Sequence, residues 1–133
     1  GGAGGSGIVV IRYEDMAFGT PNNMTLVSNA TAAEAAPTKG DIVFTYTNGA
    51  GTAVVGTNVT AEISADGGST WTSFGVVAGD TKGTTGGHTI VSKSDVTLTS
   101  TITSPYNMRY RIKTLVQSAS LQTRIQAVSL GWS

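Results

Sequence analysis

Acidic residues are the side chains of this sequence best suited to acid–base chemistry, and there are eight of them. A glycosidase needs two carboxyl groups that face one another across a cleft. These acids are scattered along the chain, and only two are neighbours, at the predicted exposed end of a strand. The eight are Glu14, Asp15, Glu34, Asp41, Glu62, Asp66, Asp80 and Asp95. Their spacing predicts no catalytic carboxyl pair.

His88 is the single histidine, so any serine or threonine nucleophile has only this imidazole as its base. It follows Gly86-Gly87, a setting typical of a surface or turn residue. The chain has no cysteine, which excludes disulfides, thiolate metal sites and cysteine nucleophiles. One histidine also excludes a multi-histidine metal site. We therefore expect no enzyme, and we assign no catalytic residue, no cofactor and no metal ligand.

The octet SADGGSTW, Ser64–Trp71, resembles the Asp-box of sialidases and other β-propeller glycosidases. In those enzymes the Asp-box is a fold element that lies away from the catalytic centre and recurs once in each blade. Here it occurs once, without a repeat of propeller period. Each residue also has a folding role, because glycine accepts positive φ, aspartate accepts backbone N–H groups and tryptophan covers the turn. We interpret the octet as a rigid turn, whose structural residues are Ser64, Asp66, Gly67, Gly68 and Thr70.

Composition limits both the size and the partners of the protein. Its 133 residues suffice for one domain, which we place at 8–133 behind a glycine-rich linker at 1–7. The formal net charge is zero and 12% of the residues are charged, so composition offers no basic patch for nucleic acid or anionic lipid. No apolar run approaches the roughly 20 residues that span a bilayer. We expect neither nucleic-acid binding nor membrane insertion.

Alternation of apolar and polar residues predicts about eight or nine strands and no helix. The predicted strands are 8–13, 24–28, 41–47, 58–64, 70–77, 88–93, 94–100, 106–114 and 124–132. Their inward positions are Ile42, Phe44, Tyr46, Val59, Ala61, Ile63, Val96, Leu98, Tyr106, Met108, Tyr110 and Ile112. Opposite the last of these rows, Arg109, Arg111 and Lys113 must face solvent or a partner.

The segments between the predicted strands are expected to be loops. Residues 29–40 are extended or loop, 48–58 form a long loop with a small hairpin at Asn48-Gly49, and 79–87 form another loop. Many short strands separated by glycine- and asparagine-rich turns are typical of an all-β fold. The expected fold is an antiparallel β-sandwich, either jelly-roll or immunoglobulin-like.

The two ends of the chain carry a resemblance. The start, GGAGGSGIVVIRY, looks like the glycine-rich segment closing on "GSGIVIIRY" in bacteriophage tail-fibre and related virion proteins. The remainder is similar to C-terminal domains of structural proteins from marine and environmental phages. It shares the strand ending in SADGGSTWT, the later MRYRIKTL and a final I-x-x-V-x-L-x-W that closes on Trp132. The resemblance implies a virion appendage, often trimeric and often near the distal end that contacts the host.

These observations lead to a functional hypothesis with two alternatives. The first is a non-enzymatic C-terminal module of a phage tail fibre or similar virion appendage, which forms a homo-oligomer, with a trimer favoured, and contributes to host-surface attachment. The alternatives are a monomeric carbohydrate-binding module and a subunit of an extracellular filament assembled by strand donation. In the last case Ile8–Tyr13 pairs with a neighbour rather than within its own domain.

Candidate contact residues follow from the same hypotheses. A host-surface glycan is a possible partner, and exposed aromatic rings stack on sugars, so the candidate platforms are Trp71, Tyr106 and Trp132. Burial in the core is the alternative for each ring, because large aromatic residues here fall in predicted strands. Binding residues concentrate on loops held by a rigid scaffold, which favours Asn48–Asn58 and Gly79–Gly87 as contact loops.

Overall fold

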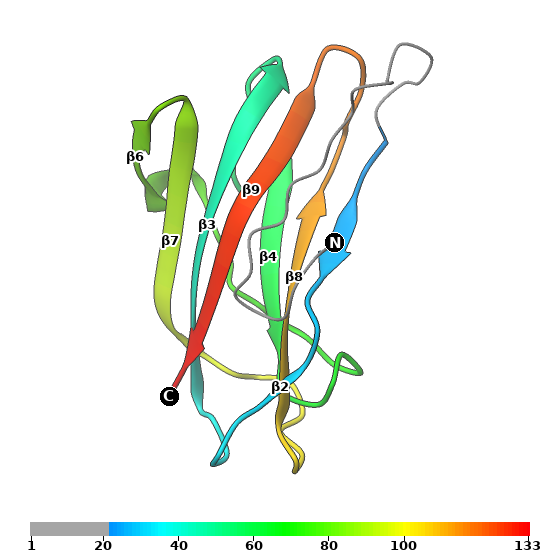
Figure 1. The fold of residues 1–133 in the computed structure, drawn as a ribbon, viewed down its shortest axis with the longest axis vertical. Helices are drawn as coiled ribbons and strands as arrows, with labels where there is room; N and C mark the ends of the chain where they lie inside the picture. The colour runs from blue at the N-terminus through cyan, green and yellow to red at the C-terminus, as the bar shows by residue number, and fades with distance from the viewer. Residues whose placement is uncertain (1–21) are drawn as a thin grey trace.

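The computed structural model describes residues 22–133, in which two antiparallel sheets pack face to face as a β-sandwich (Figure 1). One sheet has the strand order β6-β7-β3-β9, and the other has the order β1-β8-β4-β5, with β2 also paired to β8. The elements are β1 Thr25–Val27, β2 Thr31–Ala32, β3 Lys39–Ala50, β4 Val59–Ser64, β5 Thr72–Ser73, the 3₁₀ turn η2 Ala78–Asp80, β6 Thr81–Thr85, β7 His88–Thr97, β8 Asn107–Thr114 and β9 Gln122–Trp132. The predicted all-β sandwich is confirmed, whereas the predictions for the linker 1–7 and the strand Ile8–Tyr13 lie outside the described residues.

The core lies between the two sheets and is built by the predicted alternation. β3, β4 and β8 each bury every second side chain, because successive residues of a strand point to opposite faces. The buried positions of these strands include Ile42, Phe44, Tyr46, Val59, Ala61, Ile63, Met108, Tyr110 and Ile112. Tyr106, which precedes β8, and Val96 are half-buried and pack against this core. No helix in this part of the chain is long and apolar enough to cross a membrane.

The prediction of a loop at 79–87 is wrong for most of that segment. Residues 81–85 form β6, which pairs with the start of β7 through Thr84↔Thr89 and Thr85↔His88. Gly86 and Gly87 have φ of 56° and 81°, so they make the two-residue hairpin turn that matches the twist of the strands. The strand was missed because its five residues, Thr-Lys-Gly-Thr-Thr, are all exposed and show no alternation of apolar and polar side chains.

The long loop predicted at 48–58 is also shorter than expected. β3 continues to Ala50, and Asn48-Gly49 lies within the strand opposite Thr123 of β9 rather than in a hairpin turn. A Cβ at Gly49 would stand 2.7 Å from the Arg124 guanidinium carbon. The absence of a Cβ at Gly49 thus leaves room for the Arg124 side chain to lie close to the β3 backbone, and Gly49 is not part of a turn.

Two further strand boundaries differ from the prediction. The return strand expected at 70–77 contains only Thr72–Ser73, because Gly75 with φ 61° leaves the extended conformation after Phe74. The strands expected at 88–93 and 94–100 are one strand, β7, which ends at Thr97. Within β7, Asp95 has φ 57°, and its N–H donates to Asp41 Oδ1 at 2.8 Å beside a β-bulge in β3.

The strands deliver the loops to two ends of the sandwich (Figure 1). At the lower end in that view, the turn after β4 lies against the loop before β8, and an isolated bridge joins Ala65 to Ile102. We call this the Asp66 end. At the upper end the loop after β3 lies against the loop after β8, joined by Leu115 N–H to Asn58 O at 2.8 Å. We call this the Asn58 end.

Candidate functional site

The octet Ser64–Trp71 forms a turn whose centre is the Asp66 carboxylate. Its Oδ1 accepts from Ser64 Oγ at 2.7 Å and from Thr70 N–H at 2.9 Å, while its Oδ2 accepts from Thr70 Oγ1 at 2.6 Å. Gly67 and Gly68, with φ of 76° and 98°, let the chain fold back around these acceptors. The carboxylate thus holds the turn closed from inside.

The charge of Asp66 is stabilised in this position. Burial pushes the pKa of Asp66 upward, but the hydrogen bonds from Thr70 and Ser64 together outweigh burial and leave the pKa below its usual range. Asp66 therefore stays ionised at neutral pH. A general acid of a glycosidase needs the opposite, a carboxyl whose pKa is raised and which stands across a cleft from a second carboxyl.

Trp71 completes the turn on the outer face of the five-stranded sheet. The Arg111 guanidinium carbon lies 4.3 Å from the Trp71 ring centroid, which is a cation–π contact. Arg111 Nη2 also donates to Glu62 Oε1 at 2.8 Å, and the Lys113 ammonium lies 3.8 Å from the same carboxylate. The Arg111 hydrogen bond is the main reason that the pKa of Glu62 lies below its ordinary value. The predicted basic row therefore faces outward and is partly neutralised by Glu62.

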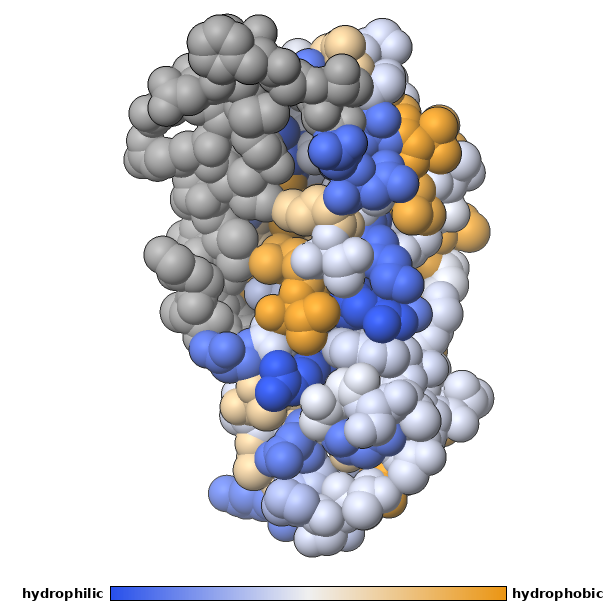
Figure 2. Space-filling model, turned by 90° about the vertical axis from the view of Figure 1, so that its right-hand side faces the viewer, coloured by the Kyte–Doolittle hydropathy of each residue, from blue (hydrophilic) through white to orange (hydrophobic). Residues whose placement is uncertain are grey.

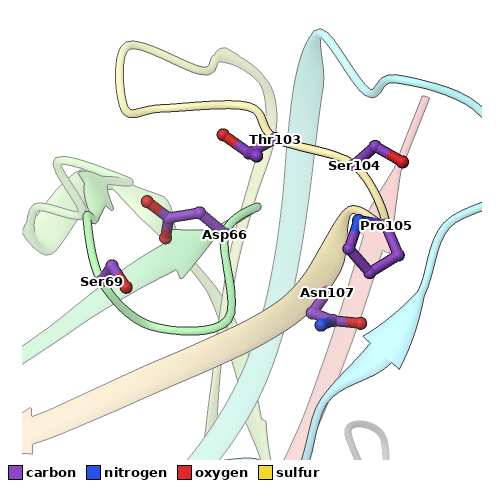
Figure 3. A pocket seen from close by; sticks show the side chains of 6 residues that line it. All are labelled: Asp66, Ser69, Thr103, Ser104, Pro105 and Asn107. Carbon is purple, nitrogen blue, oxygen red and sulfur yellow. The ribbon is translucent and has the colours of Figure 1, made fainter.

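A hollow of about 260 Å³ opens between the Asp66 turn and the loop that leads into β8. Figure 3 shows Asp66 and Ser69 on the turn and the loop that contains Thr103 on the other side of the hollow, with the Thr103 hydroxyl directed toward the turn and the Ser104 hydroxyl and the Asn107 amide directed away from it. The lining residues are Asp66, Ser69, Thr103, Ser104, Pro105 and Asn107. None of them is cationic, and five of the six are polar.

The two walls of the hollow are held together by hydrogen bonds. Thr101 N–H donates at 2.9 Å to Thr70 Oγ1, the same hydroxyl that donates to Asp66. Gly67 N–H donates to Asn107 O at 2.9 Å. A few residues away, the buried hydroxyl of Thr72 accepts from the backbone N–H groups of Thr99 and Ser100, each at 3.0 Å. The hollow therefore has fixed walls rather than two independent loops.

Several polar side chains of these walls make no hydrogen bond to the described chain; we call them uncommitted. In the part of the chain that the structure describes, the hydroxyls of Ser69, Thr103 and Ser104 and the side-chain amide of Asn107 make no hydrogen bond to the protein. Hydroxyls and amides both donate and accept, so together with the outward lone pairs of Asp66 they suit the hydroxyl groups of a polyol. Among residues 22–133 no cluster of three or more histidine or acidic residues is arranged to hold a metal ion.

The residues predicted to contact a ligand do not come together. Trp71 lies beside the Asp66 turn with Arg111 over its ring. Tyr106 and Trp132 are both half-buried and pack against the core. The loops Asn48–Asn58 and Gly79–Gly87 are not part of the hollow. His88 is a half-buried first residue of β7.

The sequence analysis assigned no contact role to Thr103, Ser104, Pro105 or Asn107, although it named their neighbour Tyr106. The local signal of this loop was Ser104-Pro105 between two strands, a dipeptide that favours a turn. Nothing local indicated that this turn would face Asp66, because the two are almost forty residues apart and meet through the Ala65↔Ile102 bridge. Comparisons with protein-family models, with curated proteins and with solved structures found no match.

Proposed function

We propose that this protein is a non-catalytic module of a phage tail fibre or similar virion appendage, and that its Asp66 end binds a glycan of the host surface. The observation that carries the proposal is the hollow with rigid walls and uncommitted hydroxyl and amide groups. Sugar recognition depends on such groups being held in place before the ligand arrives, because ordering them on binding costs affinity. The resemblance of both chain ends to phage virion proteins supports the appendage.

The chemistry of the hollow supports binding rather than bond cleavage. Asp66 is the single carboxyl group of the lining, and all its inward lone pairs accept hydrogen bonds from the turn. An ionised carboxylate so engaged stabilises a fold and accepts a hydrogen bond from a ligand, but it has no proton to give. In a virion appendage the module would act as a homo-oligomer, with a trimer favoured.

The test is a titration of the purified ¹⁵N-labelled protein with neutral sugars chosen from a glycan-array screen, followed by NMR. We expect the amide signals of the Asp66 turn and of 103–107 to shift. Thr103→Ala removes an uncommitted hydroxyl and should weaken the affinity about tenfold, the value of one hydrogen bond. Thr52→Ala, an exposed hydroxyl in the predicted contact loop at the other end, is the matched control and should change nothing.

Two results would count against this assignment. If Thr52→Ala weakens binding and Thr103→Ala does not, the ligand site is the loop at 48–58. If no sugar on the array binds, the glycan part of the proposal is lost. Light scattering on the same protein separates the appendage from a carbohydrate-binding module that works alone, since the latter stays monomeric at every concentration.

A further inference from the structure

The four edges of the two sheets differ in length. β1 has three residues, β5 has two and β6 has five, whereas β9 has eleven. Within residues 22–133 β9 pairs with β3 alone, so its other edge carries no strand. An edge of this length presents a row of backbone N–H and C=O groups to an incoming strand. β9 is therefore the most receptive edge of the described sandwich.

The sheets are also offset at this side. In Figure 1, β8 and β1 extend beyond β9, so the five-stranded sheet has an inner surface that no described strand of the other sheet covers. Its rim is apolar: Met24 and Leu26 on one sheet and Leu130 and Trp132 on the other are half-buried and pack against the core. Figure 2 looks onto this side and shows apolar side chains in the middle of the face. One more strand beside β9 would complete the layer above β1.

The entry into β1 lies at the end of the sandwich where a strand beside β9 would have to end in order to continue into β1. Asn23 Oδ1 accepts from Gln117 N–H at 2.9 Å, which places the entry into β1 at the Asn58 end. β9 starts at this same end, with Gln122, and runs to the Asp66 end (Figure 1). A segment that runs toward the Asn58 end and then crosses to β1 is antiparallel to β9. The crossing between facing sheets spans only about 10 Å.

The sequence before Asn22 contains a segment of the right pattern and position. Ile8–Tyr13, IVVIRY, lies outside the described residues, and its pattern is that of a strand. Val9, Ile11 and Tyr13 share one side of such a strand, and Ile8, Val10 and Arg12 share the other, so the side of Val9 is the one that carries no charge. The eight residues Glu14–Pro21 reach up to about 27 Å, more than the crossing requires.

We propose that Ile8–Tyr13 of the same chain adds to the free edge of β9 as an antiparallel strand, with Val9, Ile11 and Tyr13 turned toward the rim formed by Leu26, Leu130 and Trp132. The four-stranded sheet becomes five-stranded, and the longest exposed edge moves to a short strand that carries a charge. The arrangement is independent of the hollow, because none of the residues that line the hollow belongs to β1 or β9.

Hydrogen exchange followed by NMR tests the pairing with an internal control. In an antiparallel ladder alternate residues of β9 direct their N–H groups to β3, and the others direct them to the open edge. We expect both sets to be protected in the full chain. In Ile11→Pro, which removes a donor and blocks the ladder, the outward set should exchange at least about 100-fold faster, while the set facing β3 stays protected. Gly4→Pro, outside the segment, should leave both sets unchanged.

The alternatives have distinct readouts. If the outward amides of β9 exchange freely in the full chain, or if Gly4→Pro exposes them as Ile11→Pro does, the proposal is overturned. If their protection rises with protein concentration together with an oligomer by light scattering, the strand comes from another copy, and the same-chain pairing is overturned in favour of strand donation. Should Ile11→Pro unfold the sandwich, cross-strand Hα–Hα NOEs between Val9–Tyr13 and β9 in the unmodified chain decide the question.

Discussion

The two ends of the sandwich are built from the same kinds of residue but use them differently. At the Asn58 end the side-chain amides are consumed by the fold: Asn58 Oδ1 accepts from Val54 N–H at 2.8 Å and Asn48 Oδ1 from Ala53 N–H at 3.0 Å. Gln117 Oε1 accepts from Thr123 N–H at 2.7 Å. At the Asp66 end Ser64, Asp66 and Thr70 do the same work, yet four neighbouring polar groups are left over around a hollow.

The comparison teaches that polar composition does not identify a binding surface. Both ends are rich in asparagine, serine, threonine and glycine. Hydroxyls without a hydrogen bond to the described chain occur at both ends, since Thr52 and Thr57 are exposed at the Asn58 end, and what separates the Asp66 end is that such groups line the hollow there. At the Asn58 end the side chains of Asn48, Asn58 and Gln117 accept hydrogen bonds from backbone N–H groups of the loops. At the Asp66 end the hydroxyls of Ser69, Thr103 and Ser104 make no hydrogen bond to the described chain and line the hollow.

The largest expected effect is that of Asp66→Ala. This change removes the acceptor of three hydrogen bonds. A hydrogen bond to a charged group contributes about 1.5–3 kcal/mol to stability when it is buried, and less at a partly exposed carboxylate such as Asp66. We expect the free energy of unfolding in urea to fall by about 3 kcal/mol, with loss of sugar binding. Glu34→Ala, at an exposed acid, is the control, and an equal loss there would contradict the role of the turn.

Asn58→Ala should follow, with a loss of about 2 kcal/mol. Asn58 is 7% exposed, and its removal leaves the Val54 N–H without its acceptor. Because the hydrogen bonds of Asn58 stabilise only the loops of the Asn58 end, the sugar affinity measured by titration should not change. If Asn58→Ala lowered the sugar affinity as much as Thr103→Ala does, the proposal that only the Asp66 end binds the sugar would be contradicted.

Acid should weaken the Asp66 end first. The pKa values of Asp66 and Glu62 are lowered in the folded state, so the unfolded chain binds more protons as the pH falls. Their stabilisation is complete above the unfolded pKa and is lost as pH drops through the folded pKa, that is, below about pH 4.5. Neither loop of the Asn58 end, 51–58 or 115–121, contains an acid; Asp80, whose pKa is lowered chiefly by the hydrogen bond from Val77 N–H, lies outside both loops.

Amide hydrogen exchange, measured between pH 5 and pH 3 and corrected for the intrinsic exchange rates, reports the stability of each end residue by residue. Protection should decrease at 64–71 before it decreases at 51–58. In Asp66→Asn, which cannot titrate at this position, the order should disappear. Simultaneous loss at both ends of the unmodified protein would show instead that acid unfolds the sandwich as one unit.

The smallest effect on stability is expected for the uncommitted hydroxyls. Ser69→Ala and Thr103→Ala remove groups that make no hydrogen bond to the described chain, so urea unfolding should shift by no more than about 0.5 kcal/mol. Sugar affinity should nevertheless fall in both variants, whereas Asn58→Ala should lower stability and leave the affinity unchanged. A stability loss of about 2 kcal/mol in either variant would mean that its hydroxyl is part of the fold.

The predictable part of the molecule was its local pattern. Val59, Ala61 and Ile63 were expected inward and are buried, because alternation along a strand is a property of neighbouring residues. The Ser64–Thr70 turn could be read for the same reason, since Asp66 and its donors lie within four positions of one another. β6 escaped prediction because its side chains are exposed on both faces and its signal was only the glycine pair that ends it.

By itself, then, the sequence determined the class of fold, the inward rows and the turn that Asp66 closes, since each depends on residues a few positions apart. Only the tertiary structure decided that Thr103–Asn107 faces this turn, that Tyr106 and Trp132 pack against the core, and that the amides of the Asn58 end are spent. The physical reason is that a polar group is free only when every partner within reach has been counted. Those partners come from strands that are distant in sequence and are brought together by the pairing of the sheets.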